Sequence, residues 1–338
     1  MSFAALRSTE IARPRIGFLG VGWIGLNRMK ALVAADIVEP AAVADANADV
    51  SRAALDLAPR AEAVSSLDEL LSLELDGIVI ATPSALHAEQ SIRALESGAA
   101  VFCQKPLGRT AAEVASVVAA ARKADLPLGV DLSYRFTDGM QKVRDLVRSG
   151  ELGRTFAADL TFHNAYGPDK PWFYDAALSG GGCVMDLGVH LVDLALWTLD
   201  FPPVLDVSAR LFAKGKALAG DPSTVEDYAV ATLTLDGGAV IRLTCSWNLH
   251  AGQDADISAV FHGTEGGAAF RNVGGSFYEF TAERFRGTAK DVLAAPPDEW
   301  GGRAILRWAG DLAAGRGFDE EGARLVEVAK LLDRIYGR

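Results

Sequence analysis

A glycine-rich turn near the N-terminus constrains the fold more than any other feature of this chain. The sequence GVGWIG begins at Gly20, directly after the apolar run Arg15–Gly20, and leads into a helical pattern at Ile24–Ala35. Gly20 permits a tight strand-to-helix turn, Gly22 lets a pyrophosphate approach the backbone, and Gly25 lets the helix pack closely on the strand. The helix N-terminus then faces the phosphates. The pattern predicts a dinucleotide-binding βαβ unit.

An acidic residue follows at the distance where such units bind ribose. Asp45 ends the next apolar run, twenty positions after Gly25, and the residues after it are Ala46 and Asn47. A carboxylate at this position hydrogen-bonds a ribose 2′-hydroxyl and would repel a 2′-phosphate. We therefore expect NAD as the cofactor in preference to NADP, with Trp23 and Ile24 supplying helix N-terminal amides. The competing interpretation is a structural turn beside a solvated Asp45.

The first part of the chain continues to alternate strands and helices. The predicted strands are 15–20, 41–45, 76–82, 99–103 and 128–130, and the predicted helices between them are 24–35, 85–97 and 110–124. Continuous apolar strands that alternate with helices are typical of a parallel sheet covered on both faces, and ligands bind such sheets at the C-terminal strand ends. Residues 1–134 therefore form a predicted dinucleotide-binding α/β domain.

Beyond residue 135 the pattern changes to successive strands. The predicted strands are 156–162, 204–212, 228–235, 240–247 and 257–262, and the predicted helices are 138–149, 184–199 and 320–336. Strands in succession indicate a mainly antiparallel sheet. Residues 135–338 therefore form a predicted second, α+β domain, and 338 residues suit two domains.

Charge and cysteine content exclude several classes of function. Asp and Glu number 44 against 33 Lys and Arg, a net charge of −11, which disfavours binding to nucleic acid or to anionic membranes. The three cysteines and five histidines show no metal-binding spacing, so we expect neither a disulfide framework nor a metal site. The first 15 residues lack the long apolar segment of a secretion signal and are interpreted as a lead-in. These features favour a cytoplasmic location.

A lysine stands where a ligand is expected. Lys105 follows the predicted strand that ends at Cys103, and Pro106 restricts its backbone to an extended conformation. A lysine at the C-terminal end of a parallel strand points into the ligand crevice. A surface lysine is the ordinary alternative, but the strand-end position favours a role beside the nicotinamide.

The helix predicted at 184–199 carries a second group of polar residues. Asp186 and His190 are four positions apart, and Asp193 follows three positions later, so all three project from one helix face. The helix is otherwise largely apolar, and polar groups on a buried helix must be paired or functional. A buried histidine with a local aspartate partner explains the pattern equally well.

Four motifs together make the pattern specific. They are GVGWIG (20–25), ATPSALH (81–87), the Lys-Pro pair (105–106) and GGGCVMDLGVHLVD (180–193). With these motifs the chain resembles the glucose–fructose oxidoreductase / inositol dehydrogenase / MocA family over essentially its whole length. The resemblance implies a Rossmann domain followed by a domain with an open-faced sheet. It also implies oxidation or reduction of sugars, inositols and related polyols with NAD(H) or NADP(H), and a homodimer or homotetramer.

The resemblance also implies roles for individual residues. Lys105 corresponds to the catalytic lysine of the family's Glu-Lys-Pro motif, and Asp186 and His190 correspond to its catalytic acid and histidine. Thr82, Pro83 and His87 are implied to lie beside the cofactor. Gln104, which we also place at the cofactor, stands where the family usually has glutamate. This departure favours a catalytically weak, sensor-like role more than an intact motif would.

Several aromatic and basic residues are further candidates for the substrate site. Tyr134 and Arg135 follow the last predicted strand of the first domain, and Arg135 serves equally well as an interdomain salt bridge. His163, Tyr166 and Trp172 precede the helix with Asp186, where aromatic rings can stack on a sugar; covering the domain core is as good an explanation. Trp247 ends a strand, and we assign it to a subunit interface.

The preferred hypothesis is an NAD-dependent oxidoreductase that moves a hydride between nicotinamide and a secondary alcohol or ketone of a sugar, inositol or polyol. His190 would take the hydroxyl proton and Lys105 would stabilise the oxygen, although either residue could be the formal base. The alternatives are an NAD-dependent glycosidase and a regulator that senses NAD or sugar. We also expect a homo-oligomer formed through a bare apolar sheet face that contains Val240, Leu243, Trp247 and Ile257.

Overall fold

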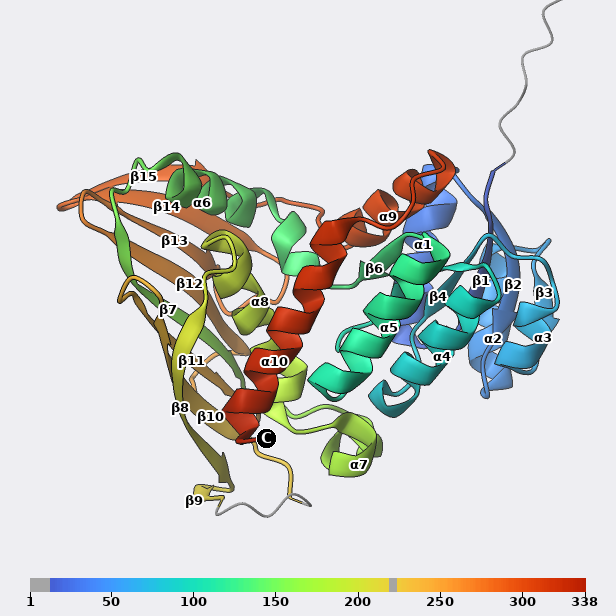
Figure 1. The fold of residues 1–338 in the computed structure, drawn as a ribbon, viewed down its shortest axis with the longest axis horizontal. Coiled ribbons are helices and arrows are strands. Elements are labelled where there is room, and N and C mark those ends of the chain that lie inside the picture. The colour runs from blue at the N-terminus through green and yellow to red at the C-terminus, as the bar shows by residue number, and fades with distance from the viewer. Residues whose placement is uncertain (1–12, 219–223) are drawn as a thin grey trace, which may run out of the picture.

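The first domain is a parallel sheet between two layers of helices. The computed structural model describes residues 13–218 and 224–338 (Figure 1). The sheet has the order β3-β2-β1-β4-β5-β6. Its strands are β1 (Arg15–Leu19), β2 (Glu39–Ala44), β3 (Glu62–Val64), β4 (Gly77–Ile80), β5 (Ala100–Cys103) and β6 (Leu128–Val130), and its helices are α1 (Trp23–Ala35), α2 (Ala48–Leu57), α3 (Leu67–Leu71), α4 (Ser84–Glu96) and α5 (Ala111–Ala124).

This domain confirms the fold expected from strand and helix alternation. The five predicted strands and three predicted helices appear with ends shifted by at most a few residues. Thr110 caps α5 as a side-chain acceptor for the Glu113 amide, and Gly98 follows α4 with φ of 93°. The short elements β3, α2 and α3 were not predicted. The predicted lead-in falls outside the described residues for its first twelve positions.

The second domain is a nine-stranded sheet with helices on one face. The strand order is β15-β14-β13-β12-β7-β11-β10-β8-β9, and every pairing is antiparallel except that of β7 with β11. The strands are β7 (Thr155–Asn164), β8 (Val204–Ala213), β9 (Lys216–Ala217), β10 (Tyr228–Leu235), β11 (Val240–Ser246), β12 (Ala255–Gly263), β13 (Gly267–Asn272), β14 (Phe280–Arg286) and β15 (Ala289–Ala294). This confirms the predicted open-faced, mainly antiparallel sheet.

Five α-helices and a π-helical turn complete the second half of the chain as far as the structure describes it. They are α6 (Asp138–Ser149), α7 (Ala176–Ser179), the π-helical turn (Val184–Gly188) that leads into α8 (Val189–Thr198), α9 (Arg303–Ala313) and α10 (Arg324–Tyr336). Short 3-10 turns lie at Ser133–Phe136, Pro171–Tyr174 and Glu320–Ala323. The helix predicted at 184–199 is therefore not uniformly α-helical, because its first turn is π-helical.

The apolar face of the second sheet is covered, so the expected oligomer surface is wrong as described. Figure 1 shows α6, α8 and α10 on one side of the sheet. Leu243, Trp247 and Ile257 are buried in the core under these helices, and Val240 is half-buried. The opposite face carries polar side chains, among them the ion pair of Arg242 with Asp159. The sequence predicts all three covering helices, but it does not show that they pack together on the apolar face of this sheet.

Two C-terminal helices connect the domains. The unpredicted helix α9 packs on the first sheet, where Trp308 joins the core beside Phe102 at a ring separation of 5.8 Å. Helix α10 lies between α5 of the first domain and α8 of the second (Figure 1). The boundary between residues 134 and 135 stays a prediction, and α9 belongs to the first domain by its packing. In the described part of the chain, no helix has both the length and the apolar character that crossing a membrane requires.

Candidate functional site

The glycine-rich turn has the geometry that a pyrophosphate site needs. Gly20 has φ of 83°, and a Cβ on Gly25 would lie 2.2 Å from the Gly20 carbonyl oxygen, so neither position accepts a side chain without strain. A Cβ on Gly22 would meet no atom within 4 Å. Gly22 is the N-cap of α1, and no side chain of the cap binds the first amides of the helix. The turn therefore fits a bound dinucleotide phosphate.

Asp45 lies at the end of β2, where the sequence places the ribose. Its Oδ2 accepts the amide of Val21 at 2.8 Å, and its Oδ1 accepts the amide of Asn47 at 2.8 Å. The carboxylate thus fixes the glycine-rich turn and remains partly exposed. Trp23 is 69% exposed beside the same turn. A ribose contact for Asp45 stays a prediction.

Gln104 belongs to a buried polar network, and a cofactor contact for it stays a prediction. Its Nε2 donates to Oδ2 of Asp131 at 2.6 Å, and Arg28 Nε donates to the same oxygen at 2.6 Å. Ser133 Oγ donates to the other oxygen of Asp131 at 3.0 Å. Asp131 is 2% exposed and ends β6, so it stands beside Gln104 across two strand ends. The sequence analysis missed Asp131 and Arg28, because neither belongs to a recognised motif.

His87 joins the two loops that flank the predicted nicotinamide position. Its Nδ1 is 2.7 Å from the Pro106 carbonyl oxygen, and its Nε2 is 2.7 Å from the Thr82 carbonyl oxygen. Burial lowers the imidazole pKa, and the Lys105 charge lowers it further, against the raising effect of the two carbonyls. Pro83 precedes α4, and Thr82 Oγ1 donates to Gln90. His87 therefore links the loop that carries Lys105 to the loop that carries Thr82.

Lys105 and Asp186 bring the two domains together in one ion pair. Lys105 Nζ donates to Asp186 Oδ1 and to the Asp186 carbonyl oxygen, each at 2.6 Å. The other carboxylate oxygen, Oδ2, accepts the indole N–H of Trp247 at 3.0 Å. Trp247 is 3% exposed. Its assignment to a subunit interface is therefore wrong, because its polar atom orients Asp186.

His190 lies one turn further along the same helix, in an apolar pocket. Its ring packs edge-on against Tyr134 at 4.9 Å and also lies near Phe162. Burial lowers the His190 pKa well below its usual 6.5, and the positive charge of Lys105 lowers it further. The imidazole is therefore neutral at pH 7, and a neutral ring nitrogen can accept a proton.

Tyr134 and Arg135 have structural partners. Tyr134 is buried against His190, and burial raises its pKa. Arg135 Nε donates to Asp193 Oδ2 at 2.7 Å, and its second nitrogen pairs with Asp193 Oδ1. The salt-bridge alternative for Arg135 thus has a named partner, Asp193, the second acid of the helix pattern.

The other substrate candidates do not touch the Lys105 group directly. His163 lies on the open face of β7, where Nδ1 is 2.7 Å from Ser246 Oγ and the ring stacks on Tyr228. Tyr166 is exposed and donates to Asp254. Trp172 stacks on a neighbouring phenylalanine that in turn packs on the ring of Trp247. Substrate contacts for His163, Tyr166 and Trp172 stay predictions.

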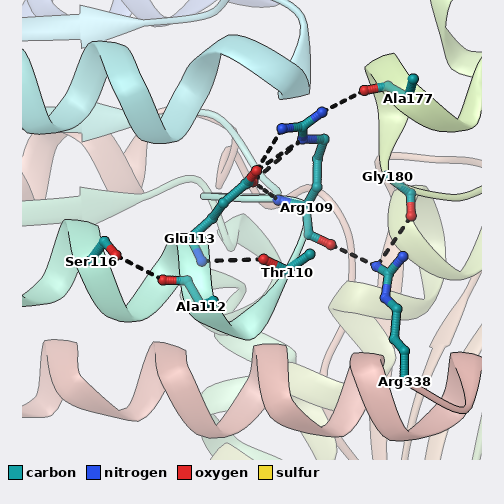
Figure 2. Close-up of polar contacts among 8 residues, drawn as sticks. All are labelled: Arg109, Thr110, Ala112, Glu113, Ser116, Ala177, Gly180 and Arg338. Carbon is teal, nitrogen blue, oxygen red and sulfur yellow. Dashed lines mark hydrogen bonds and ion pairs between the residues drawn. The ribbon is translucent and has the colours of Figure 1, made fainter.

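The segment that carries Trp172 is held against the first domain. Figure 2 shows Arg109, just before α5, donating to the Ala177 carbonyl oxygen at 2.5 Å while it also pairs with Glu113. Arg338 donates to the carbonyl oxygens of Arg109 at 2.7 Å and of Gly180 at 3.2 Å (Figure 2). The segment before the helix that carries Asp186 and His190 is therefore fixed to both the first domain and the C-terminal end of the chain.

Comparison with known proteins agrees with this geometry. Residues 14–132 match the description "Oxidoreductase family, NAD-binding Rossmann fold", and residues 140–269 match "GFO/IDH/MocA C-terminal domain". The uncharacterized oxidoreductase YrbE of Bacillus subtilis (strain 168) is 30% identical over 261 residues, which cover 76% of this chain and 73% of that protein. The chain belongs to the GFO/IDH/MocA oxidoreductase family. This confirms the resemblance that the motifs carry.

Two further relatives have more specific names. D-glucoside 3-dehydrogenase of Escherichia coli (strain K12) is 31% identical over 209 residues, and the match covers 59% of this chain and only 60% of that protein. Among solved structures, GenD2 from gentamicin A biosynthesis in complex with NAD is 25% identical, with a TM-score of 0.80 over 97% of this chain and 95% of that one. Members of the GFO/IDH/MocA family thus include a named sugar dehydrogenase.

Proposed function

We propose that this family member is an NAD-dependent dehydrogenase that acts on a secondary alcohol or ketone of a sugar, inositol or related polyol. One observation carries the proposal: Lys105 from the first domain meets Asp186 of the second, with His190 on the same helix. Asp45 beside the glycine-rich turn supports NAD in preference to NADP. The name of the 31% identical D-glucoside 3-dehydrogenase supports a sugar hydroxyl as the reacting group.

The site residues divide the chemistry between charge and proton. A bound nicotinamide would supply or accept the hydride. An ammonium has three N–H donors, and Lys105 directs two of them at Asp186, so a third remains for the substrate oxygen. This contact stabilises negative charge that develops on the oxygen. His190, kept neutral by burial and by Lys105, accepts the hydroxyl proton during oxidation and returns it during reduction.

A substrate panel tests the proposal directly. Sugars, inositols and glycosides are incubated with NAD or NADP, and NADH or NADPH fluorescence reports turnover. We expect at least one sugar or polyol to give NADH, and Lys105→Ala to lower kcat by about 10²–10⁴-fold while NAD still binds. Turnover that the Lys105→Ala variant retains would contradict the assignment.

The alternatives give different results in the same assay. A glycosidase on this fold would keep its NAD and hydrolyse a glycoside without net NADH production. A regulator would bind NAD or sugar, with no turnover on any substrate. The intact set of Lys105, Asp186 and His190 favours the dehydrogenase. Gln104, which replaces the glutamate usual in the family, is the feature that favours the regulator.

We also propose a homodimer or homotetramer in the cytoplasm. Only the family resemblance supports the oligomer, because the apolar sheet residues that were expected at the interface lie in the core of the second domain. Three unpaired buried thiols, Cys103, Cys183 and Cys245, suit a reducing compartment. Light scattering that gives the monomer mass of 35.7 kDa at micromolar concentration would contradict the oligomer.

A further inference from the structure

The helix that carries Asp186 and His190 begins in an unusual way. Its first turn is π-helical, and no side chain of its own N-cap residue satisfies the first amides. Helix N-termini leave donors without intrahelical partners, and buried donors must find them elsewhere. The Asp186 amide donates back to the carbonyl oxygen of Gly182, just before the helix, at 3.0 Å. The amides before Asp186 therefore depend on groups outside the helix.

Glu226, at the entrance to β10, satisfies most of these amides. Its carboxylate accepts the Gly182 amide at 3.0 Å and the Val184 amide at 2.8 Å, and its carbonyl oxygen accepts the Cys183 amide at 3.0 Å. The side chain is 1% exposed, and burial raises its pKa while these amides lower it. A carboxylate at a helix N-terminus also interacts favourably with the helix dipole.

Tyr336, at the end of α10, satisfies the remaining amide. Its hydroxyl accepts the Met185 amide at 3.2 Å and donates to Glu226 Oε1 at 2.8 Å. The hydroxyl is thus the link between the carboxylate and the last free amide before Asp186. Four consecutive amides, from Gly182 to Met185, end on two side chains and one carbonyl from distant segments.

Two of the three glycines before the helix, Gly181 and Gly182, are explained by the same contacts. A Cβ on Gly182 would lie 1.9 Å from the Glu226 carbonyl oxygen, and a Cβ on Gly181 would lie 2.0 Å from the Tyr336 hydroxyl. Such distances exclude any side chain at either position. The glycines therefore allow Glu226 and Tyr336 to reach the helix start.

We propose that Glu226 and Tyr336 are positioning residues that set the location of Asp186, and through it of Lys105, for the dehydrogenase reaction. The Tyr336 hydroxyl binds the amide of Met185, the residue before Asp186. Both the carbonyl oxygen and the carboxylate of Asp186 bind Lys105. A small displacement of the helix start therefore moves both acceptors of the Lys105 ammonium together. Because misplacement of about 1 Å can slow catalysis strongly, the effect falls on kcat.

The test uses Tyr336→Phe, which removes the hydroxyl and keeps the ring. This inference rests on the proposed function, so a readout independent of turnover is included: hydrogen exchange of the amides at 182–186. We expect about tenfold faster exchange there and about tenfold lower kcat at a temperature well below unfolding, the scale of one hydrogen bond. The Kd for NAD should stay within about twofold, because the glycine-rich turn is elsewhere.

A matched control is Tyr278→Phe, since Tyr278 is an exposed tyrosine with 59% of its surface accessible. It should leave both exchange and kcat unchanged. Glu226→Gln is the second variant: it removes the charge, places an N–H group among the helix amides, and should act in the same direction as Tyr336→Phe.

The outcomes separate a positioning role from a purely structural one. Exchange that is unchanged in Tyr336→Phe, or exchange that quickens while kcat of the folded enzyme stays the same, overturns the proposal. A fall in melting temperature alone, with normal kcat, does so as well. If the unmodified protein turns over no substrate, the proposed dehydrogenase function fails, and unchanged exchange in the variant would still refute the contacts at the helix start.

Discussion

Replacing Gln104 by glutamate gives a sharp test of the buried network at the end of β5. The change keeps the length of the side chain but places a carboxylate where the amide now donates to Asp131 at 2.6 Å. Two carboxylates at this separation do not both ionise in a buried site, so one proton is retained by the pair. The protonated acid can then donate its O–H to Asp131 as the amide does.

The free energy that this proton requires can be calculated. A glutamate with an ordinary pKa of about 4.3 takes up a proton at pH 7 at a cost of about 3.7 kcal/mol, from 1.36 kcal/mol for each pH unit. Arg28, which also donates to Asp131, offsets part of the repulsion, so we expect Gln104→Glu to lose about 2–4 kcal/mol of unfolding free energy at pH 7.

The sign of the pH dependence follows from the same proton. The folded-state pKa of the new carboxyl pair is raised above the unfolded value, so the folded variant binds more protons than the unfolded one. The stability of the variant therefore falls as pH rises above about 4.3, by up to about 1.4 kcal/mol per pH unit until the raised folded pKa is passed. At pH 5 the loss should be about 1 kcal/mol.

Urea denaturation at pH 5, 6, 7 and 8 measures this difference. Gln253→Glu is the control, because Gln253 is exposed and its replacement should cost less than about 0.5 kcal/mol at any pH. Gln104→Glu combined with Asp131→Asn leaves one carboxylate in the network and should lose most of the pH dependence. If the difference in unfolding free energy between the parent protein and Gln104→Glu is the same at pH 5 and pH 8, the reasoning is refuted.

Three further predictions concern the site. Asp45→Ala should narrow the preference for NAD over NADP, measured as the ratio of kcat/KM values; equal values for both cofactors in the parent protein would contradict the assigned role. The acidic limb of the kcat/KM profile should lie below pH 6.5, because His190 must be neutral to accept a proton and its lowered pKa keeps it neutral to lower pH; a limb above 6.5 would exclude it. Arg135→Met should lower the unfolding free energy by about 3–5 kcal/mol, because it leaves Asp193 buried without its cation. If this loss of unfolding free energy does not change with pH, the unpaired Asp193 carboxylate is not its cause.

The first domain could be predicted closely because its signals are local. An apolar strand, a glycine at Gly20 and a helical pattern lie within twenty residues of one another, and they determine the βαβ unit directly. The helix predicted at 110–124 is local in the same way, and Thr110 caps it in the structure. Helix α9 also had a local signal, apolar residues on one face, but its packing on the first sheet could not be derived from its place late in the chain.

The residue types of the proposed site could be read from the sequence, but their geometry could not. Lys105, Asp186 and His190 carry chemistry in their residue type, so a motif identifies them. The distance between Lys105 and Asp186 joins positions 81 residues apart, and only the packing of the two domains determines it. The same packing buries Trp247 beside Asp186, whereas the sequence analysis expected it at a subunit interface.

The residues that hold the catalytic groups escape sequence analysis for a physical reason. Trp247 and Tyr336 are large and mostly apolar, so their pattern is that of core residues, and each acts through one polar atom whose direction depends on the fold. Glu226 resembles a surface acid until the helix start at Gly182 is packed on it. A buried donor or acceptor is costly without a partner, so each such atom must be matched by a group from another segment. The proposed catalytic residues can therefore be found from their chemistry, whereas the proposed positioning residues are found by following each buried hydrogen bond to its other end.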